Sequence, residues 1–146
     1  MSFMSLRTSA FWLSFLLASS CRDVQDLFTL AGALKHEYPD YQVSVGLTDG
    51  LVLTVTVADS ALAVASCENQ ATVAMRIARF AGANYGGFNS LQTVSIAFAS
   101  QRSRDRTTAR AAGLPFRFAS TLVSAGITQA DSTRAVESCK AWRELQ

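Results

Sequence analysis

The three cysteines of this chain can take part in more kinds of chemistry than its other residues. Cys21, Cys67 and Cys139 are separated by 46 and 72 residues, and the only histidine is His36. A zinc site needs several cysteine or histidine ligands at short spacings, so we expect no metal and no cofactor. A thiol can instead be acylated, form a disulfide or stay buried and inert. The position of each cysteine in the chain indicates which of these three states it adopts.

Cys21 follows an apolar segment with the pattern of an export signal. Arg7 is the only charged side chain before it, and residues 9–18 are uncharged and mostly apolar. About ten residues in a helix span roughly 15 Å, half of the ~30 Å hydrocarbon core of a bilayer. We therefore expect residues 1–20 to be a signal peptide rather than a transmembrane helix.

Residues 17–21, Leu-Ala-Ser-Ser-Cys, resemble the lipobox of bacterial lipoprotein precursors. The resemblance implies that the signal is cut before Cys21 and that the Cys21 sulfur carries acyl chains such as palmitate. It also implies an extracytoplasmic protein held at the cell envelope by a lipid anchor. The commonest lipobox has leucine where Ala18 stands, and often glycine or alanine where Ser20 stands. Two alternatives stay open: a secreted or periplasmic protein cut near Ser20, and the N-terminal helix of a cytosolic domain.

The other two cysteines, Cys67 and Cys139, form an even pair once Cys21 is acylated or removed. Both fall in segments with helical patterns, and in an oxidising compartment they could form a disulfide. The loop that it closes could add at most on the order of 4 kcal/mol to stability in the chain-entropy model. The alternative is two buried, inert thiols.

The composition describes one globular domain with little catalytic machinery. The chain has 146 residues, 49% hydrophobic, with a formal charge of +2. These values exclude a disordered tail and a polytopic membrane protein, and leave residues 21–146 as a single domain. No Gly-x-Ser-x-Gly motif or phosphate-binding loop is present. We expect a non-enzymatic binding or scaffolding domain; the alternative is an uncharacterised hydrolase built from scattered Asp, Glu, Ser and Arg.

The positive charge gathers in one polar segment, residues 101–113. It contains Arg102, Arg104, Arg106 and Arg110 against the single acid Asp105. These arginines could contact anionic lipid headgroups, an anionic envelope polymer or an envelope protein, or they could be solvated in a hairpin loop. No aromatic side chain lies between them for stacking on bases, so no nucleic acid partner is expected.

The hydrophobic periodicity predicts an α+β fold. We expect helices at 22–38, at 61–83 with a break near 66–69, and at 129–145, and strands at 41–47, 51–57, 91–100 and 114–118. Asp49-Gly50 between the first two strands predicts a hairpin. The elements follow the order αββαββα, which an antiparallel sheet of about four strands with helices packed on one face would satisfy.

The order helix, hairpin, helix and strand between residues 23 and 98 resembles that of BON domains. Membership would imply an envelope module that binds phospholipids. Two features depart from that family: Leu51, Leu53 and Val55 lie at odd offsets from Gly50, and Thr56 stands where a second glycine is usual.

Overall fold

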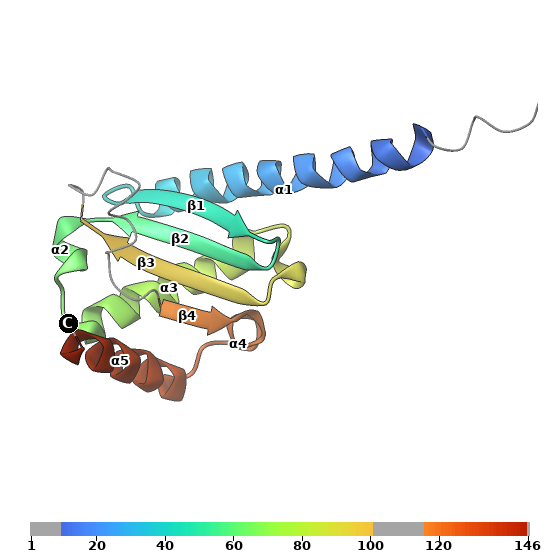
Figure 1. Cartoon of the computed structure of the whole chain (residues 1–146). Coiled ribbons are helices and arrows are strands. Elements are labelled where there is room, and N and C mark those ends of the chain that lie inside the picture. The colour runs from blue at the N-terminus through green and yellow to red at the C-terminus, as the bar shows by residue number, and fades with distance from the viewer. Residues whose placement is uncertain (1–9, 101–115, 146) are drawn as a thin grey trace, which may run out of the picture.

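A four-stranded sheet with helices on one side forms the body of the protein (Figure 1). The computed structural model describes residues 10–100 and 116–145. For residues 10–20 it describes the backbone alone. The elements are α1 (Ala10–Glu37), β1 (Gln42–Thr48), β2 (Val52–Ala58), α2 (Ser60–Ala63), α3 (Cys67–Asn84), the 3-10 turn η1 (Phe88–Ser90), β3 (Thr93–Ala99), β4 (Phe116–Ala119), α4 (Ser120–Ala125) and α5 (Gln129–Glu144).

The sheet is mixed, so the prediction of a purely antiparallel sheet is wrong. Its order is β1-β2-β3-β4, with β1/β2 and β3/β4 antiparallel and β2/β3 parallel. The reason lies in α3, whose 18 residues span about 27 Å, at least the length of a seven-residue strand. The helix returns the chain to the sheet end at which β2 begins. A strand–helix–strand connection of this kind joins parallel neighbours.

The predicted hairpin is confirmed. Asp49 and Gly50 have φ values of 53° and 69°, and the Leu51 N–H donates to the Thr48 carbonyl at 3.0 Å. The left-handed region suits glycine and is tolerated by aspartate, which explains this pair of residues at the turn.

The helical segment after the hairpin is divided, as expected, but slightly earlier than expected. Asp59 caps α2 by accepting a hydrogen bond from the Leu62 N–H at 2.7 Å, and Ser66 caps α3 by accepting one from the Asn69 N–H at 3.3 Å. Ser66 therefore begins the second helix instead of ending the first, because its hydroxyl satisfies an N–H that has no partner inside the helix.

The element order differs from αββαββα by two additional elements, the 3-10 turn η1 before β3 and the helix α4 after β4. Helix α1 begins at Ala10 and passes through Cys21 without a break, since no glycine or proline interrupts residues 10–21. The predicted strand at 114–118 corresponds to β4, which is an edge strand as expected.

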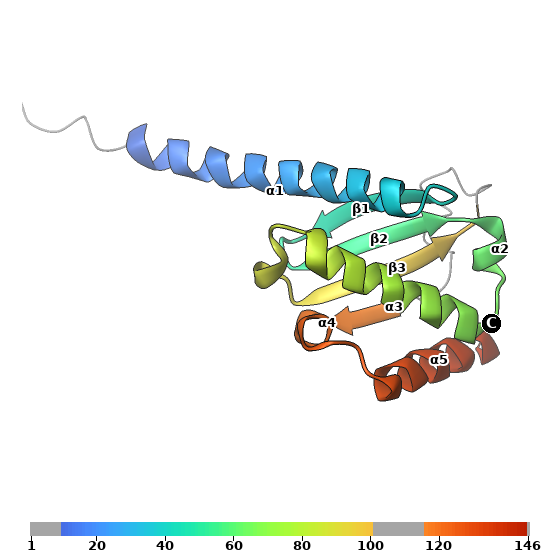
Figure 2. The same cartoon turned by 180° about the vertical axis from the view of Figure 1, so that it is seen from behind.

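The core lies between one face of the sheet and α3, which Figure 2 shows lying across that face. The strands contribute buried aliphatic side chains, and α3 contributes alanines small enough to let the helix approach closely. The fully buried members include Leu53, Val55, Val57, Val94 and Ile96 from the sheet, Ala71, Ala74, Ile77, Ala78 and Ala81 from α3, and Leu30 and Leu34 from α1.

Helix α3 has a close contact that a larger residue at Gly82 would disturb. A Cβ at Gly82 would lie 2.7 Å from Val123 Cγ1, and valine is stiff about χ1. We expect Gly82→Ala to lower the free energy of unfolding by about 1–3 kcal/mol in urea titrations. Gly32→Ala in α1, which meets nothing within 4 Å, is the matched control. It should stabilise by up to about 1 kcal/mol, and equal stabilisation by both variants would contradict this packing.

The start of α5 is held by a reciprocal capping box. The Thr128 hydroxyl and N–H donate to Asp131 Oδ2 at 2.6 and 2.9 Å, and the Asp131 N–H donates back to the hydroxyl at 3.4 Å. Both hydrogen bonds to the carboxylate lower the pKa of Asp131, the side-chain bond most. The carboxylate therefore stabilises the folded state when it is ionised.

This capping box predicts an acid sensitivity. Because the folded-state pKa of Asp131 lies below its unfolded value, its contribution is present at neutral pH and is lost as the pH falls below about 4. Asp131→Asn should lower the free energy of unfolding at pH 7 and weaken its dependence on pH between 7 and 3. Glu137→Gln, an exposed position of the same helix, should change neither. An unaltered pH dependence in Asp131→Asn would rule out this role.

Candidate functional site

Cys21 lies on α1 with an exposed side chain and takes no part in a disulfide. Figure 1 shows the N-terminal part of α1 continuing beyond the sheet. The core side chains described for α1, Leu30 and Leu34, both follow Cys21 in the chain. Acylation of the Cys21 sulfur stays a prediction.

Cys67 and Cys139 form a disulfide that joins α3 to α5. Their sulfurs are 2.07 Å apart and their Cα atoms 5.7 Å apart. Cys67 is the first residue of α3 and is buried, while Cys139 lies in the second half of α5. The bridge therefore connects the start of the central helix to the C-terminal part of the chain.

Polar contacts on the same two helices surround this bridge. Lys140 Nζ lies 2.6 Å from Glu68 Oε1, and the hydrogen bond from Lys140 is the main cause of the lowered pKa of Glu68. The Arg143 guanidinium donates to the Ala65 carbonyl just before α3. The disulfide is thus one of several bonds that fix α5 against the start of α3.

The four arginines that could contact an anionic partner or be solvated in a loop, Arg102, Arg104, Arg106 and Arg110, lie outside the described residues. Arg117, the next arginine along the chain, is exposed on β4 between the buried Phe116 and Phe118. Its side chain therefore leaves the sheet on the face opposite the core.

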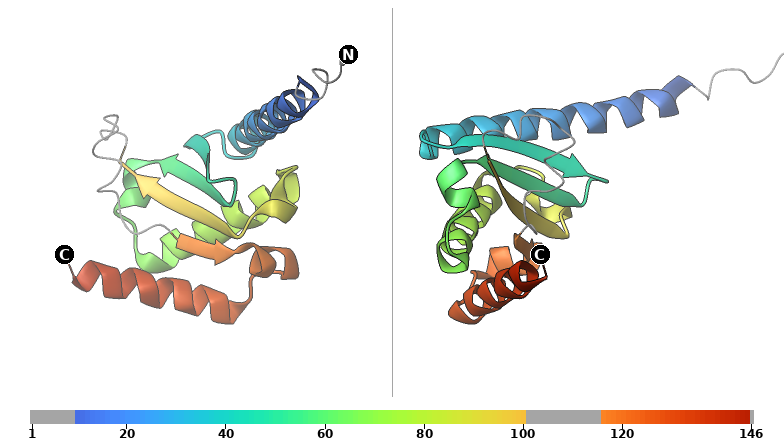
Figure 3. Two further views of the ribbon diagram at one scale, coloured as in Figure 1. Left: turned by 45° about the vertical axis from the view of Figure 1, so that its right-hand side comes forward. Right: turned by 60° about the vertical axis from the view of Figure 1, so that its left-hand side comes forward.

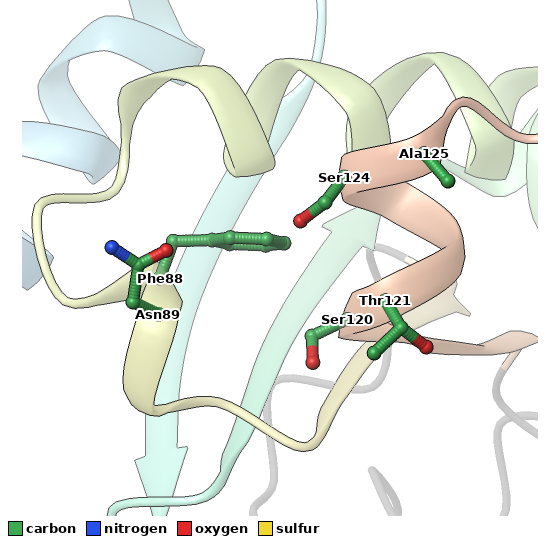
Figure 4. A pocket seen from close by; sticks show the side chains of 6 residues that line it. All are labelled: Phe88, Asn89, Ser120, Thr121, Ser124 and Ala125. Carbon is green, nitrogen blue, oxygen red and sulfur yellow. The ribbon is translucent and has the colours of Figure 1, made fainter.

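A shallow hollow of about 460 Å³ lies where η1 meets α4 (Figure 4). Figure 4 shows the Ser124 side chain pointing toward the Phe88 ring across this hollow. Ser120 is partly committed, because its hydroxyl donates to the Leu91 carbonyl at 2.6 Å. The lining residues are Phe88, Asn89, Ser120, Thr121, Ser124 and Ala125.

The chemistry available in this hollow is hydrogen bonding. Its lining offers hydroxyl and amide groups beside an aromatic ring, and none of the lining side chains is a carboxylate, histidine, lysine or cysteine. General acid–base or nucleophilic catalysis requires a group that can exchange protons near neutral pH. The lining can therefore exchange hydrogen bonds with a ligand or a peptide and can pack an apolar group against the Phe88 ring.

A neighbouring hollow reaches toward Arg79 and the loop after α3. The Arg79 guanidinium is already engaged, donating to the Ile127 carbonyl at 2.6 Å. In the same loop, burial raises the pKa of Tyr85, and the charges of Asp23 and Asp26 on α1 raise it further. The acidic flank of α1 thus faces this loop.

The sequence did not predict the hollow. Its residues come from 88–89 and 120–125, which are far apart in the chain, and neither η1 nor α4 was expected. The serine and threonine spacing at 120, 121 and 124 indicates a shared surface only once that segment is known to be helical.

The only histidine of the chain, His36, lies in the last turn of α1 and is exposed.

The described ranges 10–100 and 116–145 hold neither a candidate metal site nor a candidate membrane span. They contain no cluster of three or more histidine, cysteine or acidic side chains able to hold a metal ion. Among their helices, none combines the length and the apolar character needed to cross a bilayer.

The disulfide predicts a specific thiol count. Cys21→Ala, denatured without reductant, should show no reactive thiol, and both remaining cysteines should react after reduction. The double variant Cys67→Ser/Cys139→Ser should lose up to about 4 kcal/mol of unfolding free energy, because its unfolded chain is no longer closed into a loop. Two reactive thiols in unreduced Cys21→Ala would refute the bridge.

Comparisons with known proteins found no similarity on which to base a function. No protein-family model matches the chain, and neither a curated protein nor a solved structure matches it. The residues and geometry described above are therefore the basis for the proposal that follows.

Proposed function

We propose that this chain is the precursor of a small envelope lipoprotein, anchored through Cys21, whose domain at residues 21–146 binds or scaffolds without catalysing a reaction. The observation that carries the proposal is the division of the three cysteines. Two of them are bridged, and the third is exposed at the position that resembles the lipobox cysteine.

The bridge supports a location outside the reducing cytosol. Disulfides persist in the periplasm and at cell surfaces, whereas cytosolic thiols are usually kept reduced. Cys67 and Cys139 satisfy one another, so Cys21 has no intramolecular partner among the cysteines. A free, exposed cysteine directly after an apolar segment is suited to modification at the membrane surface.

The position of α1 is compatible with cleavage before Cys21. The buried residues Leu30 and Leu34, and the partly buried Leu27, all lie on the C-terminal side of that position. A chain that begins at Cys21 would keep these contacts. The remaining part of α1, residues 21–37, would be about 25 Å long.

The hollow between η1 and α4 supports a binding role. Its lining of Asn89, Ser120, Thr121 and Ser124 can exchange hydrogen bonds with a ligand but holds no general acid or base. A partner at the envelope, either a protein or an anionic polymer, fits the exposed Arg117 and the arginine-rich segment expected at 101–113. The membrane is the partner of the anchor itself.

Metabolic labelling tests the anchor. Bacteria that express the full chain and are fed radioactive palmitate should label the wild type, because the fed palmitate enters the acyl chains attached at Cys21. Cys21→Ala should abolish the label, and Cys67→Ser/Cys139→Ser should retain it. Label that persists in Cys21→Ala, or a wild type that is exported without label, would contradict the proposal.

A further inference from the structure

Helix α1 exposes apolar side chains next to Cys21. Phe28 is 75% exposed and Val24 is 51% exposed, although the helix buries Leu30 and Leu34 completely on another side. At about 100° per residue, Cys21, Val24, Phe28 and Lys35 fall within an arc of about 60°. We call these four residues the outer stripe.

The outer stripe faces away from the rest of the molecule. Phe28 and Leu30 are about 200° apart around the helix, so the exposed ring lies opposite the buried leucine. Figure 3 shows the sheet and the other helices on one side of α1. No described element covers the outer stripe.

The acidic side chains of α1 lie on the side of the helix away from the outer stripe. Its acids Asp23, Asp26 and Glu37 are all about 140° or more from Phe28 around the helix. Asp26 lies against the loop after α3, where a Cβ at Gly86 would be 2.9 Å from Asp26 Oδ2. Lys35, the one charged member of the stripe, is exposed and is paired with no acid of the described residues.

We propose that α1 lies along the membrane surface with the outer stripe facing an anionic bilayer. This inference rests on the proposed anchor, because acyl chains on Cys21 would leave the helix from this stripe. Val24 and Phe28 are one and two turns further along and would meet the interface beside those chains. The Lys35 ammonium, at the far end, would reach anionic headgroups.

Tryptophan fluorescence in the full, processed chain tests this orientation. Phe28→Trp and the control Thr29→Trp are made with Trp142→Phe, since Trp12 belongs to the segment that is removed. Thr29 is exposed about 100° from Phe28 and outside the stripe. The purified lipoproteins are placed in phosphatidylglycerol–phosphatidylcholine vesicles whose acyl chains carry bromine near the headgroup end.

The tryptophan of Phe28→Trp should emit at shorter wavelength and be quenched about twofold more strongly than that of Thr29→Trp, because the apolar face of an interfacial helix enters the acyl boundary. Equal quenching of the two variants in acylated protein would overturn the orientation and leave the anchor standing. A blue-shifted but unquenched Phe28→Trp would also overturn it, since protein would then cover the stripe. A Cys21 without acyl chains, shown by mass, would overturn both proposals.

Discussion

The close packing of α3 on the sheet, chiefly on β3, is the contact on which the other parts of the fold depend. Its alanines, Ala74 and Ala78 among them, are fully buried against the aliphatic face of the sheet. Because α3 crosses the sheet from one end to the other, it makes β2 and β3 parallel neighbours and leaves its two flanks open. Helix α1 packs on the flank beside β1 and α5 on the flank beside β4, so both terminal helices are positioned by this one layer.

The features proposed to be functional lie on those flanking elements rather than in the core. Cys21 and the outer stripe are on α1, Cys139 is on α5, and the hollow lies where η1 meets α4. The disulfide fixes α5 to the first residue of α3, while the buried leucines fix the C-terminal half of α1. A protein organised in this way can be held at a membrane through one helix and can still present its other side to a partner.

The parts of the fold that depend on neighbouring residues could be predicted from the sequence. The Asp49-Gly50 hairpin and the caps at Asp59 and Thr128 follow from local backbone and hydrogen-bonding preferences. The parallel pairing was missed although the length of the segment between the hairpin and β3 favours a crossover helix. The hollow could not be predicted, because Asn89 and Ser124 meet only after the sheet has formed. The orientation of the outer stripe likewise required knowing which side of α1 is buried.

The central claim is that a bridged domain is anchored through Cys21. The most direct test is the intact mass, without reductant, of the protein extracted by detergent from bacterial membranes. The account predicts a chain that begins at Cys21, carries a diacylglyceryl group on that residue and contains the Cys67–Cys139 bond. A chain that retains residues 1–20, or one that begins elsewhere with an unmodified Cys21, would contradict it.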